Sequence, residues 1–145
     1  YKVHLDGYNL LPFLTGQAAP DAAWPRREFF YWNDDGQLVA MRVDRWKLVF
    51  MEQRSEKFGV WMEPFVTLRV PLVFDLRMDP FERAQHNANG YYEWMEGMVQ
   101  WAGAPGTAIA GKMISSFQEF PPRQRPSSFN LDDVMSSLTA GGEGK

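Results

Sequence analysis

The sequence predicts an α+β fold, with about four antiparallel strands covered on one face by a long or kinked C-terminal helix. In the first half of the chain, apolar and polar residues alternate along short runs, which is the period of a strand. In the second half, apolar residues recur at spacings of three and four, which is typical of an amphipathic helix. With 145 residues, of which 45% are hydrophobic, the chain can build one packed core.

The first residues predict a connecting region rather than part of the sheet. Apolar spacing in residues 5–16 indicates a short helix, and Asp6 stands where a capping residue is expected. We therefore predict a junction segment over residues 1–25 and the α+β domain over residues 26–140. The glycine-rich residues 141–145 are expected to form a flexible tail.

The four expected strands cover residues 27–33, 37–43, 46–51 and 71–76. Asn33-Asp34-Asp35-Gly36 joins the first two, and Asp-Gly between strand-like runs predicts a tight hairpin turn. Residues 52–70 are expected to form a long loop, a kind of segment that is often functional. Its aromatic residues Trp61 and Phe65 either pack the loop onto the sheet or face a ligand.

The fourth strand is expected to stop at Asp79-Pro80, because proline disfavours a helical conformation in the residue before it. In such a turn the side chain of Asp79 can accept backbone N–H bonds, and Glu82 can act in the same way. We therefore interpret Asp79, Pro80 and Glu82 as structural residues rather than catalysts. Lys47, in the third strand, is expected to pair with Asp44 or Glu28.

The apolar spacing over residues 87–117 predicts a helix, and Asn87 or Asn89 is expected to cap its start. Residues 103–106 contain glycine and proline, so we expect either two helices or one kinked helix. Trp94 falls on the apolar face of this helix. Asn130 is expected to cap a final short helix.

The stretch from Phe74 to Glu82 resembles the C-terminal signature of the sulfatase family, which reads Phe-Asp-Leu-x-x-Asp-Pro-x-Glu. Segments that resemble bacterial arylsulfatases occur in order along the rest of the chain, at residues 5–16, 46–50, 61–65 and 120–124. The resemblance implies the C-terminal domain of a bacterial arylsulfatase, without its N-terminal catalytic domain. On this resemblance, residues 1–25 would come from the end of that catalytic domain, which would be the partner of this chain.

The resemblance also implies a division of chemistry. A sulfatase carries a formylglycine made from Cys or Ser in a Cys/Ser-x-Pro-x-Arg motif, and a calcium ion held by Asp and Asn. This chain has no cysteine, and none of its serines is followed two positions later by proline. We therefore expect no catalytic residue, metal ligand or cofactor here, and we expect the parent enzyme to use calcium and formylglycine on a small-molecule sulfate ester.

The expected role of the chain is to brace the catalytic domain and to shape the substrate cleft, with Trp61 and Phe65 as the cleft residues. The alternative is a self-standing carbohydrate- or protein-binding module, which requires a contiguous exposed aromatic patch. A sulfatase domain should instead expose an apolar surface that includes Leu10, Leu11 and Phe13.

Composition narrows the range of partners. The net charge is −3 and the basic residues are scattered, which argues against nucleic-acid binding. No apolar run has the length of a membrane span, so no membrane contact is expected. The compartment of the parent enzyme, bacterial periplasm or cytoplasm, stays open.

Overall fold

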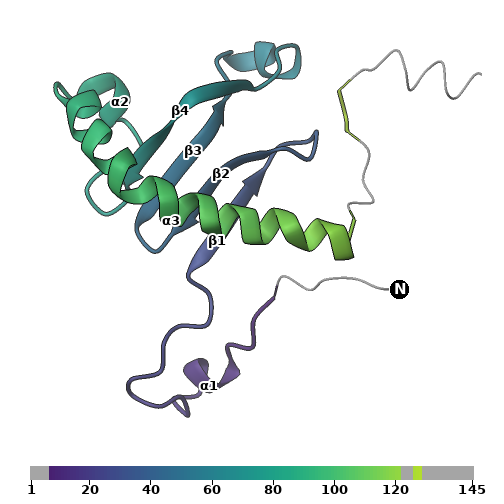
Figure 1. The fold of residues 1–145 in the computed structure, drawn as a ribbon, viewed down its shortest axis with the longest axis vertical. Coiled ribbons are helices and arrows are strands. Elements are labelled where there is room, and N and C mark those ends of the chain that lie inside the picture. Colours follow the sequence, from purple (N-terminus) through teal and green to yellow (C-terminus); the bar gives the residue numbers. More distant parts are fainter. Residues whose placement is uncertain (1–6, 122–125, 129–145) are drawn as a thin grey trace, which may run out of the picture.

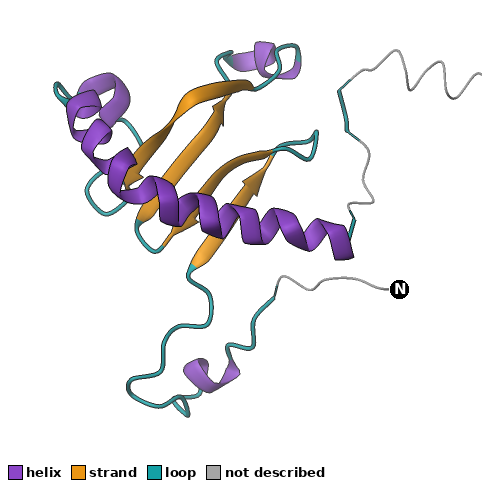
Figure 2. Cartoon of the chain, in the orientation of Figure 1, coloured by secondary structure: helices purple, strands orange, loops and turns teal. Residues whose placement is uncertain are grey.

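The computed structural model describes residues 7–121 and 126–128, which form one sheet and one long helix packed against it (Figure 1). The strands are β1 Glu28–Trp32, β2 Leu38–Val43, β3 Trp46–Glu52 and β4 Val66–Asp75. The helices are α1 Leu11–Leu14, the 3-10 helix η1 Lys57–Trp61, α2 Ala84–Asn87 and α3 Tyr91–Glu119. Figure 2 shows α3 running across the four strands, so the predicted α+β architecture is confirmed.

The sheet has the order β1-β2-β3-β4, and every neighbouring pair is antiparallel. The predicted hairpin between β1 and β2 is confirmed. The Oδ1 of Asn33 accepts the backbone N–H groups of Asp35 at 3.1 Å and Gln37 at 2.8 Å. Gly36 has a φ of 74°, a conformation that glycine adopts without steric cost.

The fourth strand is longer than the sequence predicts. β4 begins at Val66, so the predicted loop over residues 52–70 is wrong in its second part. The pairing register with β3 shifts between Val49 and Met51, from Leu72 opposite Val49 to Thr67 opposite Met51. Pro71 lies in this irregular stretch of an edge strand, where a missing N–H donor costs little.

The core lies between α3 and one face of the sheet. Met41, Leu48 and Val73 stand side by side in the register of β2, β3 and β4, and Met41 and Val73 are fully buried. Tyr91 and Met95 of α3 pack onto them. The Tyr91 hydroxyl donates a hydrogen bond of 2.9 Å to the carbonyl oxygen of Val73, and burial raises the pKa of this phenol.

The long helix differs from the prediction at its start. Neither Asn87 nor Asn89 caps it, because Asn87 ends α2 and the N-cap is Gly90 with a φ of 80°. This left-handed glycine turns the chain from α2 into α3. Pro105 lies inside α3 without dividing it, so of the two predicted alternatives the structure has the single helix.

A close approach fixes where α3 crosses the sheet. A Cβ atom on Gly106 would lie 2.8 Å from the Cδ2 atom of Leu48, so any larger residue there would have to displace the core. A Cβ on Gly111, five residues further along, would meet nothing within 4 Å. Gly106 therefore marks the point at which the helix backbone rests on β3.

The N-terminal helix is shorter than predicted. Within the described part of residues 5–16, only Leu11–Leu14 is helical, and the side chain of Asn9 accepts the Leu11 N–H at 3.1 Å. Figure 1 shows α1 beyond the end of β1, apart from the sheet. Asp6, the helix expected from Asn130 and the tail over residues 141–145 lie outside the described residues.

Candidate functional site

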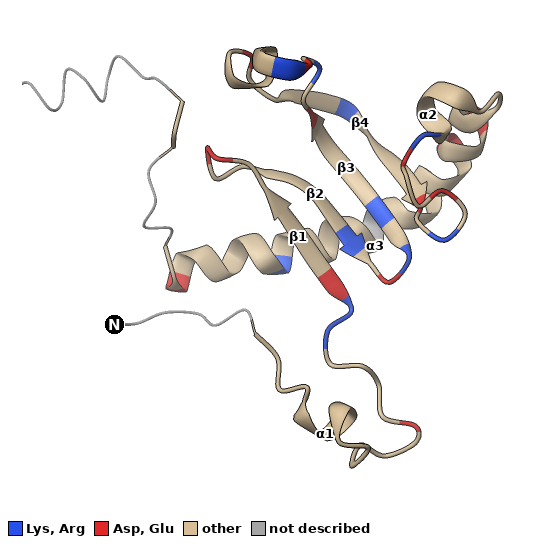
Figure 3. Cartoon of the chain, turned by 180° about the vertical axis from the view of Figure 1, so that it is seen from behind, with Lys and Arg blue, Asp and Glu red and all other residues tan. Residues whose placement is uncertain are grey.

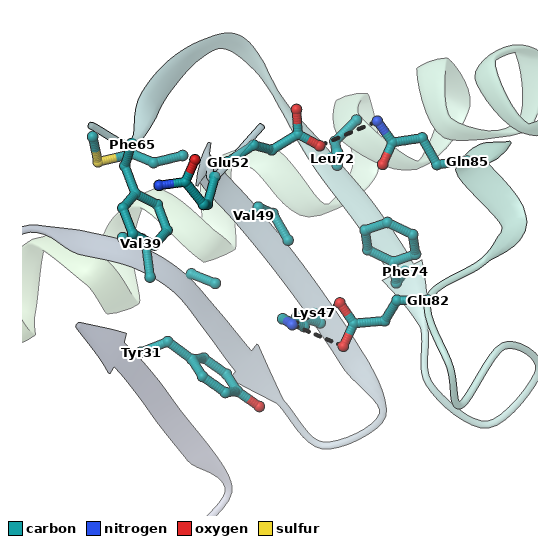
Figure 4. Close-up of a pocket in the computed structure, with 13 residues that line it drawn as sticks. Tyr31, Val39, Lys47, Val49, Glu52, Phe65, Leu72, Phe74, Glu82 and Gln85 are labelled. Atoms are coloured by element: carbon teal, nitrogen blue, oxygen red, sulfur yellow. Dashed lines mark hydrogen bonds and ion pairs between the residues drawn. The ribbon is translucent and has the colours of Figure 1, made fainter. Parts of the chain in front are cut away.

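A pocket of about 280 Å³ opens on the sheet face that points away from α3 (Figure 4). Successive strand residues point to opposite faces. Because Met41 and Leu48 face the helix, their neighbours Ala40 and Val49 line the pocket floor. The pocket is lined by Tyr31, Val39, Ala40, Lys47, Val49, Met51, Glu52, Gln53, Phe65, Leu72, Phe74, Glu82 and Gln85.

One wall of the pocket is an ion pair between β3 and the turn after β4. The Nζ of Lys47 lies 2.6 Å from Oε2 and 2.8 Å from Oε1 of Glu82, and Figure 4 shows the two side chains pointing toward each other. The predicted pairing of Lys47 with Asp44 or Glu28 is therefore wrong. The lysine side chain is 15% exposed and the glutamate side chain 33%, so water screens this pair only in part.

The backbone conformation of Glu82 is unusual. Its φ of 55° lies in the left-handed region, which is uncommon for a residue with a side chain. The expected backbone-capping role of its carboxylate is not what the structure shows, because both oxygens bind Lys47. The same ammonium lies 4.8 Å from the ring centroid of Tyr31, within the range of a cation–π contact.

The opposite rim of the pocket is polar and holds the start of the β3–β4 connection. Gln85 of α2 donates a 3.1 Å hydrogen bond to the carboxylate of Glu52. Gln53 donates to the carbonyl oxygens of Glu63 at 2.7 Å and Val60 at 3.4 Å. These bonds fix the connection that contains η1 beside the pocket.

The two predicted cleft residues occupy different positions. Phe65 lines the pocket and is half-buried, whereas Trp61 lies outside it and is 80% exposed. Trp61 therefore does not pack onto the sheet. With Phe58, Val60 and Met62 it forms what we call the apolar tip, residues 58–62, at the end of the β3–β4 hairpin.

The Asp79-Pro80 turn joins the site to α2. The carboxylate of Asp79 accepts the backbone N–H groups of Ala84 at 2.7 Å and Arg83 at 3.0 Å, which is the local bonding expected from the sequence. These bonds, first that of Ala84 and then that of Arg83, hold the pKa of Asp79 below its usual value. Pro80 is exposed and is not one of the residues that line the pocket.

Charge and metal chemistry at the site are limited. Figure 3 shows basic and acidic positions of both signs scattered over this side of the molecule. Among residues 7–121 and 126–128, no three His, Asp or Glu side chains come together in a way that could hold a metal ion. In the same part of the chain, no helix is long and apolar enough to cross a membrane.

Sequence reasoning missed Lys47, Glu52 and Gln85 as site residues. The strand period could have placed Lys47 on the face opposite Leu48, but nothing local indicates that Glu82, 35 positions later, lies next to it. The site as a whole is a half-apolar hollow with the Lys47–Glu82 ion pair in its wall. It can hold a side chain or a small molecule.

Comparison with known proteins gives one match. The family model described as the C-terminal region of aryl-sulfatase matches residues 24–108, more than half of the chain. The matched residues include all four strands, the pocket and the first part of α3. No curated protein matches the chain.

We expect the Lys47–Glu82 pair to contribute measurably to stability. In a double-mutant cycle with Lys47→Met and Glu82→Gln, the coupling free energy should be about 1–2 kcal/mol, because the pair is partly shielded from water. The exposed pair Arg27–Asp44, with side chains 62% and 48% exposed, is the control and should couple more weakly than Lys47–Glu82, because water screens it. Urea unfolding measures both cycles, and equal coupling in the two would contradict this role.

Asp79→Ala should lower the free energy of unfolding by about 1 kcal/mol at neutral pH, as the loss of a capping side chain does. Because the folded pKa lies below the unfolded value of about 3.9, the stabilisation is fully present above that value. It is lost as the pH falls through the folded pKa. Urea unfolding at falling pH should show the deficit of the variant shrinking. An unchanged Tm beside the exposed control Asp34→Ala would remove this role.

Proposed function

The chain belongs to the family of aryl-sulfatase C-terminal regions, and from this membership we propose that it braces the catalytic domain of a sulfuric ester hydrolase and shapes one wall of its substrate cleft. A family defined as a C-terminal region is part of a larger enzyme. The single observation that carries the bracing role is the amount of exposed apolar surface. Such surface usually marks an interface.

Two groups of exposed apolar side chains lie on segments outside the sheet. On the apolar tip, Phe58 is 74% and Met62 73% exposed, in a 3-10 turn that extends beyond β3 and β4 (Figure 1). Around α1, Leu11 and Leu14 are also exposed, and Phe13 makes an edge contact with the Trp24 ring at 4.9 Å. We propose that the catalytic domain covers part of this surface.

The chemistry belongs to the rest of the enzyme. The sequence has no Cys/Ser-x-Pro-x-Arg motif, so a formylglycine nucleophile would stand in the catalytic domain, together with the calcium ion that holds the sulfate. The substrate of the parent enzyme would be a small-molecule sulfate ester. The contribution of this chain is then positional, through the residues that border the cleft.

For the cleft wall we propose Trp61 and Phe65. They are four residues apart in the same connection, and Gln53 ties that connection to the end of β3 through two hydrogen bonds. An exposed indole and a half-buried phenyl ring offer faces on which an aryl group can stack. A self-standing binding module would also use exposed rings, but family membership favours the enzyme.

The purified 145-residue chain should not hydrolyse 4-nitrophenyl sulfate. Co-expression with the upstream catalytic domain should give turnover, and the two parts should co-purify. The control is the catalytic domain alone, which should be less stable to heat than the pair. Turnover by the isolated chain, or a catalytic domain equally stable without it, would overturn the bracing role.

In the complete enzyme, Trp61→Ala and Phe65→Ala should each raise KM for aryl sulfates by about twofold to tenfold, the loss of one aromatic contact. Tyr92→Ala removes another exposed ring, which lies at the start of α3 rather than in the β3–β4 connection, and should leave KM unchanged. Steady-state kinetics on several aryl sulfates measure these effects. If kcat and KM of Trp61→Ala match the wild type on all of them, Trp61 does not line the cleft.

A further inference from the structure

Three tryptophans meet at one flank of α3, away from the pocket and from η1. The ring of Trp46, at the start of β3, lies 6.4 Å from the ring of Trp94 and 5.6 Å from the ring of Trp101. Trp94 is 36% and Trp101 62% exposed. The sequence placed Trp94 on the apolar face of the helix. In the structure it lies at the border of that face rather than within the core.

A glycine leaves the helix surface bare between the two exposed indoles. Residues three and four apart are neighbours on a helix, so Gly97 adjoins both Trp94 and Trp101. A Cβ atom on Gly97 would meet nothing within 4 Å. Glycine disfavours helix, and its use at an exposed helical position opens space at the backbone. We call Trp46, Trp94, Gly97 and Trp101 the tryptophan notch.

Polar groups stand around the notch. Gln100 is a further helix neighbour of Gly97 and supplies a carboxamide, whereas the carboxylate of Glu93 lies toward Gly90. At the sheet side, the guanidinium of Arg45 lies 4.8 Å from the Trp46 ring centroid, and its Nε lies 3.4 Å from the buried carboxylate of Asp75. Ring faces, hydrogen-bond donors and acceptors thus share one small surface.

We propose that the tryptophan notch binds a neutral saccharide. A sugar ring has an apolar C–H face that stacks on an indole and a rim of hydroxyls that exchange hydrogen bonds with amide and guanidinium groups. Trp94 and Trp101 are seven residues apart, about 10 Å along the helix axis, which makes the notch elongated and suits an oligosaccharide. Trp46 holds both rings in place before binding, which lowers the entropic cost of association.

Other small ligands fit less well. Glu93 and Glu96 lie on the same stretch of α3 and disfavour an anion such as an aryl sulfate. A quaternary ammonium is recognised by rings that enclose it, whereas this notch is open along Gly97. The proposed site needs neither the nucleophile nor the calcium of the parent enzyme. Saccharide binding can therefore be tested independently of the sulfatase role.

The test titrates the purified chain with neutral hexasaccharides of β-1,4-linked glucose, xylose and mannose, using tryptophan fluorescence and calorimetry. At least one should bind at millimolar concentration or below. Gly97→Leu should weaken binding by about tenfold or more, because the side chain fills the notch. Trp101→Ala should do the same.

The matched control is Gly111→Leu, a second open position on the same helix outside the notch. It should bind like the wild type. Both leucine variants favour helix, so circular dichroism should report unchanged folding and a loss at residue 97 would reflect the site itself. Failure of all three hexasaccharides to bind, equal binding by Gly97→Leu and wild type, or binding of choline in place of sugar would each overturn the proposal.

Discussion

A single helix can cover only one face of a four-stranded sheet, and the form of this molecule depends on how its second face is completed. α3 buries the face that carries Met41, Leu48 and Val73. On the other face no helix of the described chain lies across the strands. There, the Lys47–Glu82 ion pair brings the turn after β4 back over the sheet, and α2 comes with it. Leu72 and Phe74 are buried beneath these segments, and a hollow remains beside them.

The parts of this fold that local chemistry determines could be predicted from the sequence. Asp-Gly specified the hairpin, and the two periodicities specified the sheet and the long helix. Local chemistry was insufficient where a distant partner decides. Val66–Val70 looked like loop because Pro71 resembled a strand start, yet pairing with β3 extends the strand across it. Gly90 rather than an asparagine begins α3, because α2 places the chain at an angle that needs a left-handed residue.

The same division applies to the candidate site. Bonds between Asp79 and the two following N–H groups span five positions at most, and the turn motif indicated them. The partner of Lys47 is set by tertiary geometry, and the sequence offered closer but wrong carboxylates in Glu28 and Asp44. Trp61 and Phe65 were singled out together, but the 3-10 helix that ends at Trp61 turns one ring to solvent while the other lines the pocket.

The sheet has two free edges, and such edges invite strand-to-strand aggregation. On β4, Pro71 has no N–H to offer, and the register shift next to it interrupts the flat row of backbone groups. On β1, Arg27 bonds inward to Asp44 through its carbonyl oxygen, so the carbonyl of Glu28 points outward, where the Arg26 side chain donates to it at 3.3 Å. Both edge strands are therefore protected against pairing with a strand of another molecule. This would limit aggregation of the region when it is separated from the rest of the enzyme.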